Sequence, residues 1–147
     1  MKILIIEDDE LKHEHLDKFI KGQFQEPIVN WRKSYHSGLQ ELLTVDYDLI
    51  LLDMSMHVYE KTAQESGGSF ETYAGRLILS EIDLNDITTK VIVVTGYDVY
   101  GDGKTLEELK NELRSEFGDY YLDTVYFVSK EDKWKKEITS LIKQNYK

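Results

Sequence analysis

The 147-residue sequence has no cysteine and a single proline, Pro27. Without cysteine the chain forms no disulfides and carries out no thiol chemistry, which is compatible with a reducing cytoplasm. No apolar run approaches the roughly 20 residues of a membrane span. The short apolar run at the N-terminus leads directly into acidic residues, unlike a signal peptide. We therefore expect a cytoplasmic protein that does not insert into membranes.

Positive charge is also scarce, since 18 Lys and Arg stand against 28 Asp and Glu, for a net charge of −10. Such a field disfavours loose binding to nucleic acid or anionic lipid, so we expect no direct contact with nucleic acid. The charge suits a site that collects a divalent cation. Acidity that only keeps the protein soluble explains the overall charge equally well.

Short apolar runs alternate with amphipathic segments along the whole chain, which has the length of one ordinary domain. The runs lie at 3–6, 28–31, 49–52, 91–94 and 125–128. Continuous apolar runs are typical of strands buried on both faces. Five strands alternating with five helices predict an α/β fold, a doubly wound parallel sheet with helices on both faces. We expect the flavodoxin-like strand order 2-1-3-4-5.

Two helix starts have the spacing of a capping box, Ser37 with Gln40 and Thr105 with Glu108. We expect helices to begin at Ser37 and Thr105. Residues 54–73 show no clear periodicity, so no element is predicted there.

Polar side chains follow four of the predicted strands. Glu7 and Asp8 follow the first strand and Asp53 the third, while Thr95 and Lys130 end the fourth and fifth. In the expected order, strands one and three flank the crevice in which such sheets bind ligands. Carboxylates this close need a cation or raised pKa values, and Mg²⁺ binds to one or two carboxylates together with phosphate oxygens. The pattern indicates a magnesium site.

The same set suits phosphoryl transfer to a carboxylate. A lysine and a threonine hydroxyl can neutralise a phosphoryl group in transit, and Asp53 is the natural nucleophile, giving an acyl phosphate. Each residue has a plainer reading: Asp8 as a helix cap, Thr95 as a strand end, Lys130 as a surface lysine. The combination at four strand ends favours magnesium-dependent phosphorylation.

At these residues the sequence resembles the receiver domain of two-component response regulators, the CheY-like fold. The matching stretches are 2–10, 37–43, 47–54, 91–96 and 128–130. The resemblance implies a single receiver domain over residues 1–147. It also implies insertions near 58–72 and 97–104, and no output domain.

The resemblance further implies the residues that hold the metal. Glu7 and Asp8 correspond to the acidic metal pair, and Asp53 to the phosphoacceptor, which also binds Mg²⁺. The backbone carbonyl of Ser55 corresponds to a further metal ligand.

Other roles follow from the same resemblance. Thr95 corresponds to the residue that binds the phosphoryl group and Lys130 to the lysine that pairs with it. Thr95 and Phe127 correspond to the switch pair. Ser55 and Tyr97 stand where the family tunes autodephosphorylation.

The sequence departs from the family pattern near the site. His57 and Glu131 stand where prolines are usual, and the two insertions change the surface that receivers offer to partners. These departures affect the expected contact with partner proteins more than the expected phosphorylation chemistry.

We therefore expect a single-domain response regulator. A phosphohistidine on a histidine kinase or phosphotransfer protein would donate to Asp53, and the output would be a contact with a downstream protein, or phosphorelay. The chain would not be an enzyme beyond self-phosphotransfer and autodephosphorylation of its own aspartyl phosphate. A homodimer is compatible with this expectation.

Three alternatives stay open at this point. A pseudo-receiver would use the same fold as a binding module that is never phosphorylated. A Mg²⁺-dependent phosphatase would use Asp53, although such enzymes usually carry a second aspartate where Ser55 stands. A flavodoxin-like cofactor binder would need a phosphate-binding loop after the first strand, where acids stand instead.

Overall fold

The computed structural model describes residues 1–61 and 67–146, and it confirms the predicted sheet. Parallel strands lie in the order β2-β1-β3-β6-β7. They are β1 (Lys2–Ile6), β2 (Ile28–Arg32), β3 (Leu49–Leu52), β6 (Lys90–Thr95) and β7 (Tyr121–Tyr126). Counted along the chain within this sheet, the order is 2-1-3-4-5.

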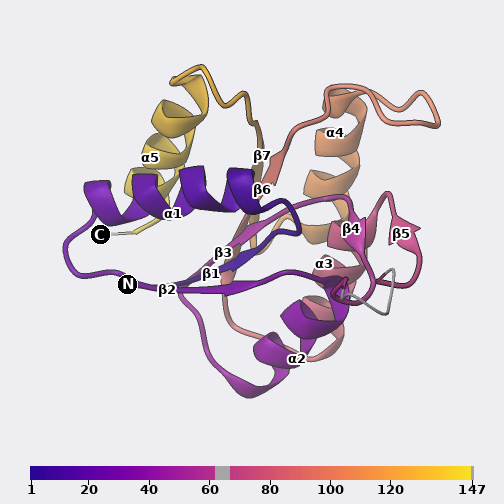
Figure 1. Cartoon of the computed structure of the whole chain (residues 1–147), viewed down its shortest axis with the longest axis horizontal. Helices are drawn as coiled ribbons and strands as arrows, with labels where there is room; N and C mark the ends of the chain where they lie inside the picture. The colour runs from indigo at the N-terminus through magenta and orange to yellow at the C-terminus, as the bar shows by residue number, and fades with distance from the viewer. Residues whose placement is uncertain (62–66, 147) are drawn as a thin grey trace.

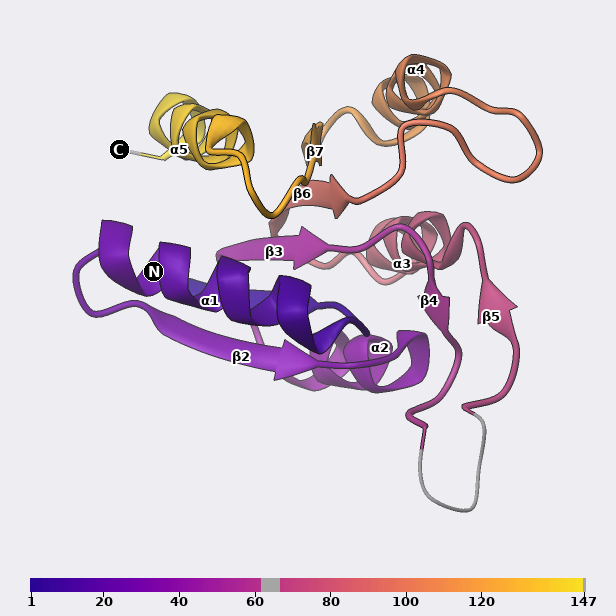
Figure 2. The same ribbon diagram turned by 45° about the horizontal axis from the view of Figure 1, so that its top comes forward.

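Helices cover both faces of the sheet in two groups (Figures 1 and 2). They are α1 (Glu10–Gln23), α2 (Tyr35–Thr44), α3 (Ala74–Leu84), α4 (Leu106–Phe117) and α5 (Lys133–Asn145). Helices α1 and α5 pack on one face, and α2, α3 and α4 pack on the other. The doubly wound α/β fold is thereby confirmed.

The core consists of two layers that share the strands. Ile3 and Ile5 pack towards α1 and α5, whereas Leu4 and Ile6 pack towards the opposite helices. All four side chains are fully buried. Because successive residues of a strand point to opposite faces and both faces are covered, the strands have unbroken apolar sequences.

A small hairpin lies beyond the end of β3: its first strand directly precedes the predicted insertion and its second strand lies near the insertion's end. Strands β4 (Met56–His57) and β5 (Phe70–Glu71) pair antiparallel, with Met56 opposite Glu71 and His57 opposite Phe70. Figure 2 shows this hairpin extending away from the main sheet. Strands of two residues leave no periodicity in the sequence, so they were not predicted. The insertion's residues 62–66 lie outside the described residues.

One predicted helix start is wrong and one is confirmed. Helix α2 begins at Tyr35, and its N-cap is Ser34, whose hydroxyl oxygen accepts from the Ser37 N–H at 3.1 Å. Ser34 has an extended backbone, so the helix begins directly after it and Ser37 lies in the first turn. Thr105 caps α4 as predicted, accepting from the Glu108 N–H at 3.2 Å.

The last strand begins earlier than predicted. Strand β7 starts at Tyr121, and its pairing with β6 shifts register between Val91 and Ile92. Asp123 interrupts the apolar pattern of this edge strand, and its carboxylate lies 3.3 Å from the Arg114 guanidinium. Because Asp123 breaks the apolar run, the sequence pattern did not predict the first half of this edge strand.

Candidate phosphoacceptor and metal site

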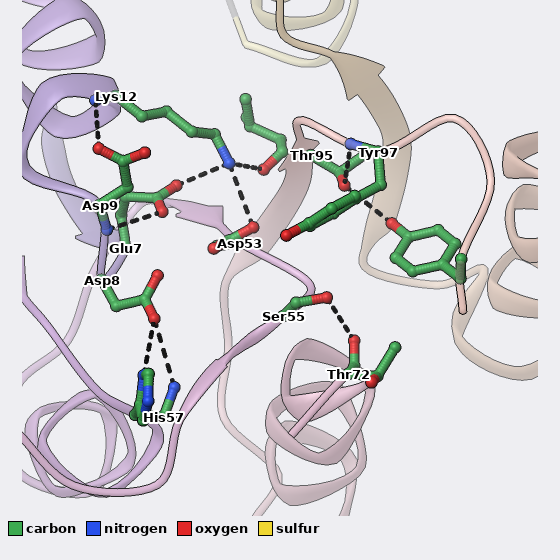
Figure 3. A network of polar contacts seen from close by, with 12 residues as sticks. Glu7, Asp8, Asp9, Lys12, Asp53, Ser55, His57, Thr72, Thr95 and Tyr97 are labelled. Atoms are coloured by element: carbon green, nitrogen blue, oxygen red, sulfur yellow. Dashed lines mark hydrogen bonds and ion pairs between the residues drawn. The ribbon is translucent and has the colours of Figure 1, made fainter. Parts of the chain in front are cut away.

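Three carboxyl groups meet at the carboxyl ends of β1 and β3. Strands β1 and β3 pair in register up to Ile6 and Leu52, and the Asp53 N–H donates to the Ile6 carbonyl at 2.9 Å. Glu7 and Asp8 therefore stand beside Asp53, as predicted. One carboxylate oxygen from each lies within 4.8 Å of the other two (Figure 3). Clustered oxygens of this kind suit a hard cation such as Mg²⁺.

Lys12 reaches into this cluster from the first turn of α1. Its Nζ lies 2.7 Å from Glu7 Oε1, and it donates to Asp53 Oδ1 at 3.1 Å and to the Val94 carbonyl at 2.6 Å (Figure 3). The side chain is 8% exposed. Three oxygens surround the ammonium nitrogen, two of them as hydrogen-bond acceptors and the third, from Glu7, as an ion-pair partner. Lys12 thus links the ends of β1, β3 and β6.

Burial and charge shift the pKa values of this group. Burial raises the pKa of Glu7 to about 9; the Lys12 ammonium opposes the shift and Asp53 adds to it. Burial alone would lower the pKa of Lys12, but the carboxylates of Asp53 and Glu7 outweigh it and raise that pKa. The site therefore keeps its lysine charged and favours a proton on its most deeply buried carboxyl group.

Asp8 contacts the inserted hairpin. Its Oδ2 lies 3.3 Å from His57 Nδ1 and accepts from the His57 N–H at 3.4 Å. Burial raises the pKa of Asp8, with Asp53 adding to the shift and His57 opposing it. The hairpin therefore places a histidine against one of the three acids, a contact that the sequence did not predict.

Thr95 ends β6 with its side chain fully buried. Its Oγ1 forms a hydrogen bond with the Tyr100 hydroxyl at 2.8 Å and accepts from the Tyr97 N–H at 3.2 Å. Tyr100 is itself buried, and burial raises its pKa to about 12, although its hydrogen bond with Thr95 opposes the shift. Half of the Tyr97 side chain is exposed beside it. The threonine hydroxyl is thus already engaged by a tyrosine of the second insertion.

Ser55 connects the site to the first insertion. It is buried, and its hydroxyl donates to the Thr72 carbonyl at 2.6 Å (Figure 3). Residues on both sides of the insertion are held together by this bond, immediately beyond Asp53.

Lys130 and Phe127, which follow β7, differ in their exposure to solvent. Lys130 is exposed in the turn after β7, and within residues 1–61 and 67–146 it forms no hydrogen bond or ion pair. Phe127 is half-buried with its ring centroid 4.9 Å from that of Trp134. The Lys12 Nζ lies 6.0 Å from the Phe127 centroid, so the aromatic ring borders the lysine of the site.

The structure thus gathers the predicted Glu7, Asp8, Asp53 and Thr95 at one edge of the sheet. Among the described residues, Lys130 forms no hydrogen bond or ion pair with any of them. Sequence reasoning missed Lys12 and Tyr100. A signal for Lys12 exists, because helical side chains lean towards the N-terminus and a lysine in the first turn leans back to the strand end. Tyr100 lies in a segment without a pattern that could have singled it out.

Known proteins resemble this chain over nearly its whole length. No family model matches the chain. The Detocs response regulatory protein DtcB of Enterobacter cloacae (strain JD6301) is 31% identical over 149 residues, covering 98% of this chain and 97% of that protein. No helix in the described residues has the length and apolar character needed to cross a membrane.

Solved structures share the fold. The receiver domain of the Francisella response regulator 1452 matches with a TM-score of 0.65 at 20% identity, covering 99% of this chain and 98% of that one. The response regulator TrrA from Thermotoga maritima, solved in complex with Mg²⁺-BeF, matches with a TM-score of 0.57 at 18% identity, covering 95% of this chain and 97% of that one. With the DtcB match spanning nearly all of both chains, this chain belongs to the response regulators and has the receiver-domain fold.

Proposed function

We propose that the chain is a receiver that accepts a phosphoryl group on Asp53 in the presence of Mg²⁺. The observation that carries the proposal is the position of Asp53, which is 6% exposed at the end of β3, among two further acids and a lysine. This edge is where open α/β sheets bind ligands. The Lys12 ammonium group beside this carboxylate supplies positive charge, which phosphoryl transfer requires to offset the negative charge of the phosphoryl oxygens.

The residues present fit a divalent cation. Glu7, Asp8 and Asp53 each offer an oxygen within 4.8 Å of the others, and carboxylate oxygens are the hard ligands that Mg²⁺ prefers. These three, with the backbone carbonyl of Ser55, would hold Mg²⁺. The ion would supply positive charge that neutralises phosphoryl oxygens.

The chemistry at Asp53 is a displacement on phosphorus. A carboxylate oxygen of Asp53 forms a bond to phosphorus as the bond to the donor breaks, and the electron pair leaves with the donor. With acetyl phosphate as donor, the leaving group is acetate, which needs no proton at neutral pH. The product is an aspartyl phosphate, from which water later releases inorganic phosphate.

The switch would follow from the charge that the phosphoryl group adds. A phosphoryl oxygen would compete with Tyr100 for the hydroxyl of Thr95, and the half-buried Phe127 would respond. Ser55 and Tyr97, next to these residues, would tune the loss of phosphate. By resemblance Lys130 pairs with the phosphoryl group, and this assignment stays a prediction.

Partners follow from the family. A phosphohistidine on a histidine kinase or a phosphotransfer protein is the proposed donor. The proposed output is contact with a downstream protein or relay of the phosphoryl group, without turnover of an external substrate. The DtcB relative is itself named a response regulatory protein.

The test is intact mass after incubation with Mg²⁺ and acetyl phosphate. We expect a gain of one phosphoryl group, absent in Asp53→Asn and absent when the metal is chelated. An unchanged mass without release of inorganic phosphate would contradict the proposal.

One observation favours a pseudo-receiver as second candidate. Lys12 already compensates the charge of Asp53, and the Thr95 hydroxyl already has the Tyr100 hydroxyl as partner. A site satisfied in this way holds together without phosphate. Unchanged mass together with no Mg²⁺ binding by calorimetry would support this second candidate.

A further inference from the structure

Lys12 is the buried lysine at Asp53 in this structure. Its ammonium nitrogen lies 3.1 Å from Asp53 Oδ1, whereas Lys130 is exposed and stands in a turn beyond β7. Receivers pair the acceptor with a lysine, and by sequence position that lysine is Lys130. The geometry assigns the contact to a different residue, on a different element.

The position of Lys12 is specified by its surroundings. The N-cap Asp9 starts α1 and accepts from the backbone N–H of Lys12 at 3.3 Å. The side chain then extends past the Phe127 ring to the carboxylates that follow β1 and β3 and to a backbone carbonyl of β6. An ammonium group with two hydrogen bonds and an ion pair inside the protein is held in one geometry, unlike an exposed lysine on a flexible stem.

We propose that Lys12, in place of Lys130, supplies the positive charge that pairs with Asp53 and with the phosphoryl group it accepts. This inference rests on the proposed function of Asp53. During transfer, negative charge moves onto oxygens bonded to phosphorus next to Asp53, and a fixed ammonium group at this distance stabilises it. The bonds that form and break are those described above, and Lys12 keeps its proton throughout.

The same contacts have a second consequence. Lys12 and a divalent cation are like charges that share Glu7 and Asp53 as partners, so each weakens the binding of the other. Removal of the ammonium group should therefore tighten Mg²⁺ binding while it slows phosphorylation. Damage to the fold would weaken both, so the opposite directions distinguish a chemical role from a structural one.

The experiment compares Lys12→Met, Lys130→Met and Lys21→Met. Methionine keeps an apolar side chain beside Phe127, and Lys21 is a matched control because it lies on the same helix, 58% exposed and away from the site. Phosphorylation by acetyl phosphate at saturating Mg²⁺ is followed by intact mass, Mg²⁺ affinity by isothermal calorimetry, and folding by circular dichroism.

We expect phosphorylation of Lys12→Met to slow by about tenfold or more, with Mg²⁺ bound more tightly than by the parent. Lys130→Met should lose less, and Lys21→Met should match the parent. Phosphorylation of Lys12→Met at the parent's rate would overturn the inference and leave the proposed function intact, as would a larger loss in Lys130→Met. A folded Lys12→Met with both properties weakened would also overturn it.

Two further outcomes are decisive. If the parent gains no phosphoryl group, the proposed function fails and the inference fails with it. If Lys12→Met does not fold, Lys130→Met decides alone: retention of phosphorylation supports Lys12, and its loss restores Lys130 as the pairing lysine.

Discussion

At the scale of single residues, folding strongly alters the ionisation of Glu7. Its ordinary pKa is 4.5, and burial raises it to about 9 in the folded protein. Between these values the folded chain holds a proton that the unfolded chain has lost. Its contribution to stability is therefore fully present below the unfolded pKa and is lost as pH rises through the folded pKa.

This sign gives a prediction for the metal-free protein. The free energy of unfolding, measured by urea denaturation with a chelator, should fall from about pH 6 to about pH 8.5. Glu7→Gln mimics the protonated side chain, so its stability should depend less on pH over this interval. Equal pH dependence in the two proteins would show that Glu7 ionises normally in the folded state.

The hydrogen bond between Thr95 and Tyr100 gives a second prediction at this scale. Both side chains are buried, and the bond is 2.8 Å long. Tyr100→Phe removes one partner and should lower the free energy of unfolding by about 1 kcal/mol. Tyr97→Phe is the control, since half of that side chain is exposed. A loss in the control as large as in Tyr100→Phe would argue against this assignment.

At the scale of elements, the close approach of α3 to the end of β3 positions Asp53. Gly75 lies at the start of α3, and its N–H donates to the Met54 carbonyl at 2.8 Å. A Cβ at Gly75 would lie 2.7 Å from the Asp53 carbonyl oxygen and 3.0 Å from the Met54 Cα. Both are backbone atoms, so relief requires the chain itself to move.

We therefore expect Gly75→Ala to destabilise the protein by about 1–3 kcal/mol in chemical denaturation. Gly22→Ala is the matched control in α1, where a Cβ would have no neighbour within 4 Å. That substitution should be neutral or stabilise by up to about 1 kcal/mol, because alanine favours the helix. Equal effects of the two substitutions would contradict a special role for the contact at Gly75.

The main elements were predictable because each has its own local signal. The β3 run Leu49–Leu52 is buried on both faces, and Thr105 caps α4 as its spacing predicted. The hairpin of β4 and β5 was not, because Met56 and His57 pair with residues near the far end of the insertion. Such pairing depends on how the intervening chain brings the two segments together, and a local sequence pattern does not show this.

At the scale of the whole molecule, parallel pairing accounts for the part of the site that sequence predicted. Glu7 and Asp53 meet because β1 and β3 are neighbours in register, and that follows from the strand order. Lys12 and Tyr100 arrive from a helix and a loop, and their reach depends on side-chain direction in the folded state. Lys130 follows the last strand of the sheet, and among the described residues it forms no hydrogen bond or ion pair with Asp53.

The most direct test of the account locates the phosphoryl group on the chain. Protein treated with Mg²⁺ and acetyl phosphate is reduced with borohydride, which converts an aspartyl phosphate to homoserine, and its peptides are sequenced by tandem mass spectrometry. We predict homoserine at position 53, and none in the reaction with chelator. Reduction at Asp8 or another acid in place of Asp53, or at no residue of the phosphorylated protein, would contradict Asp53 as the phosphoacceptor.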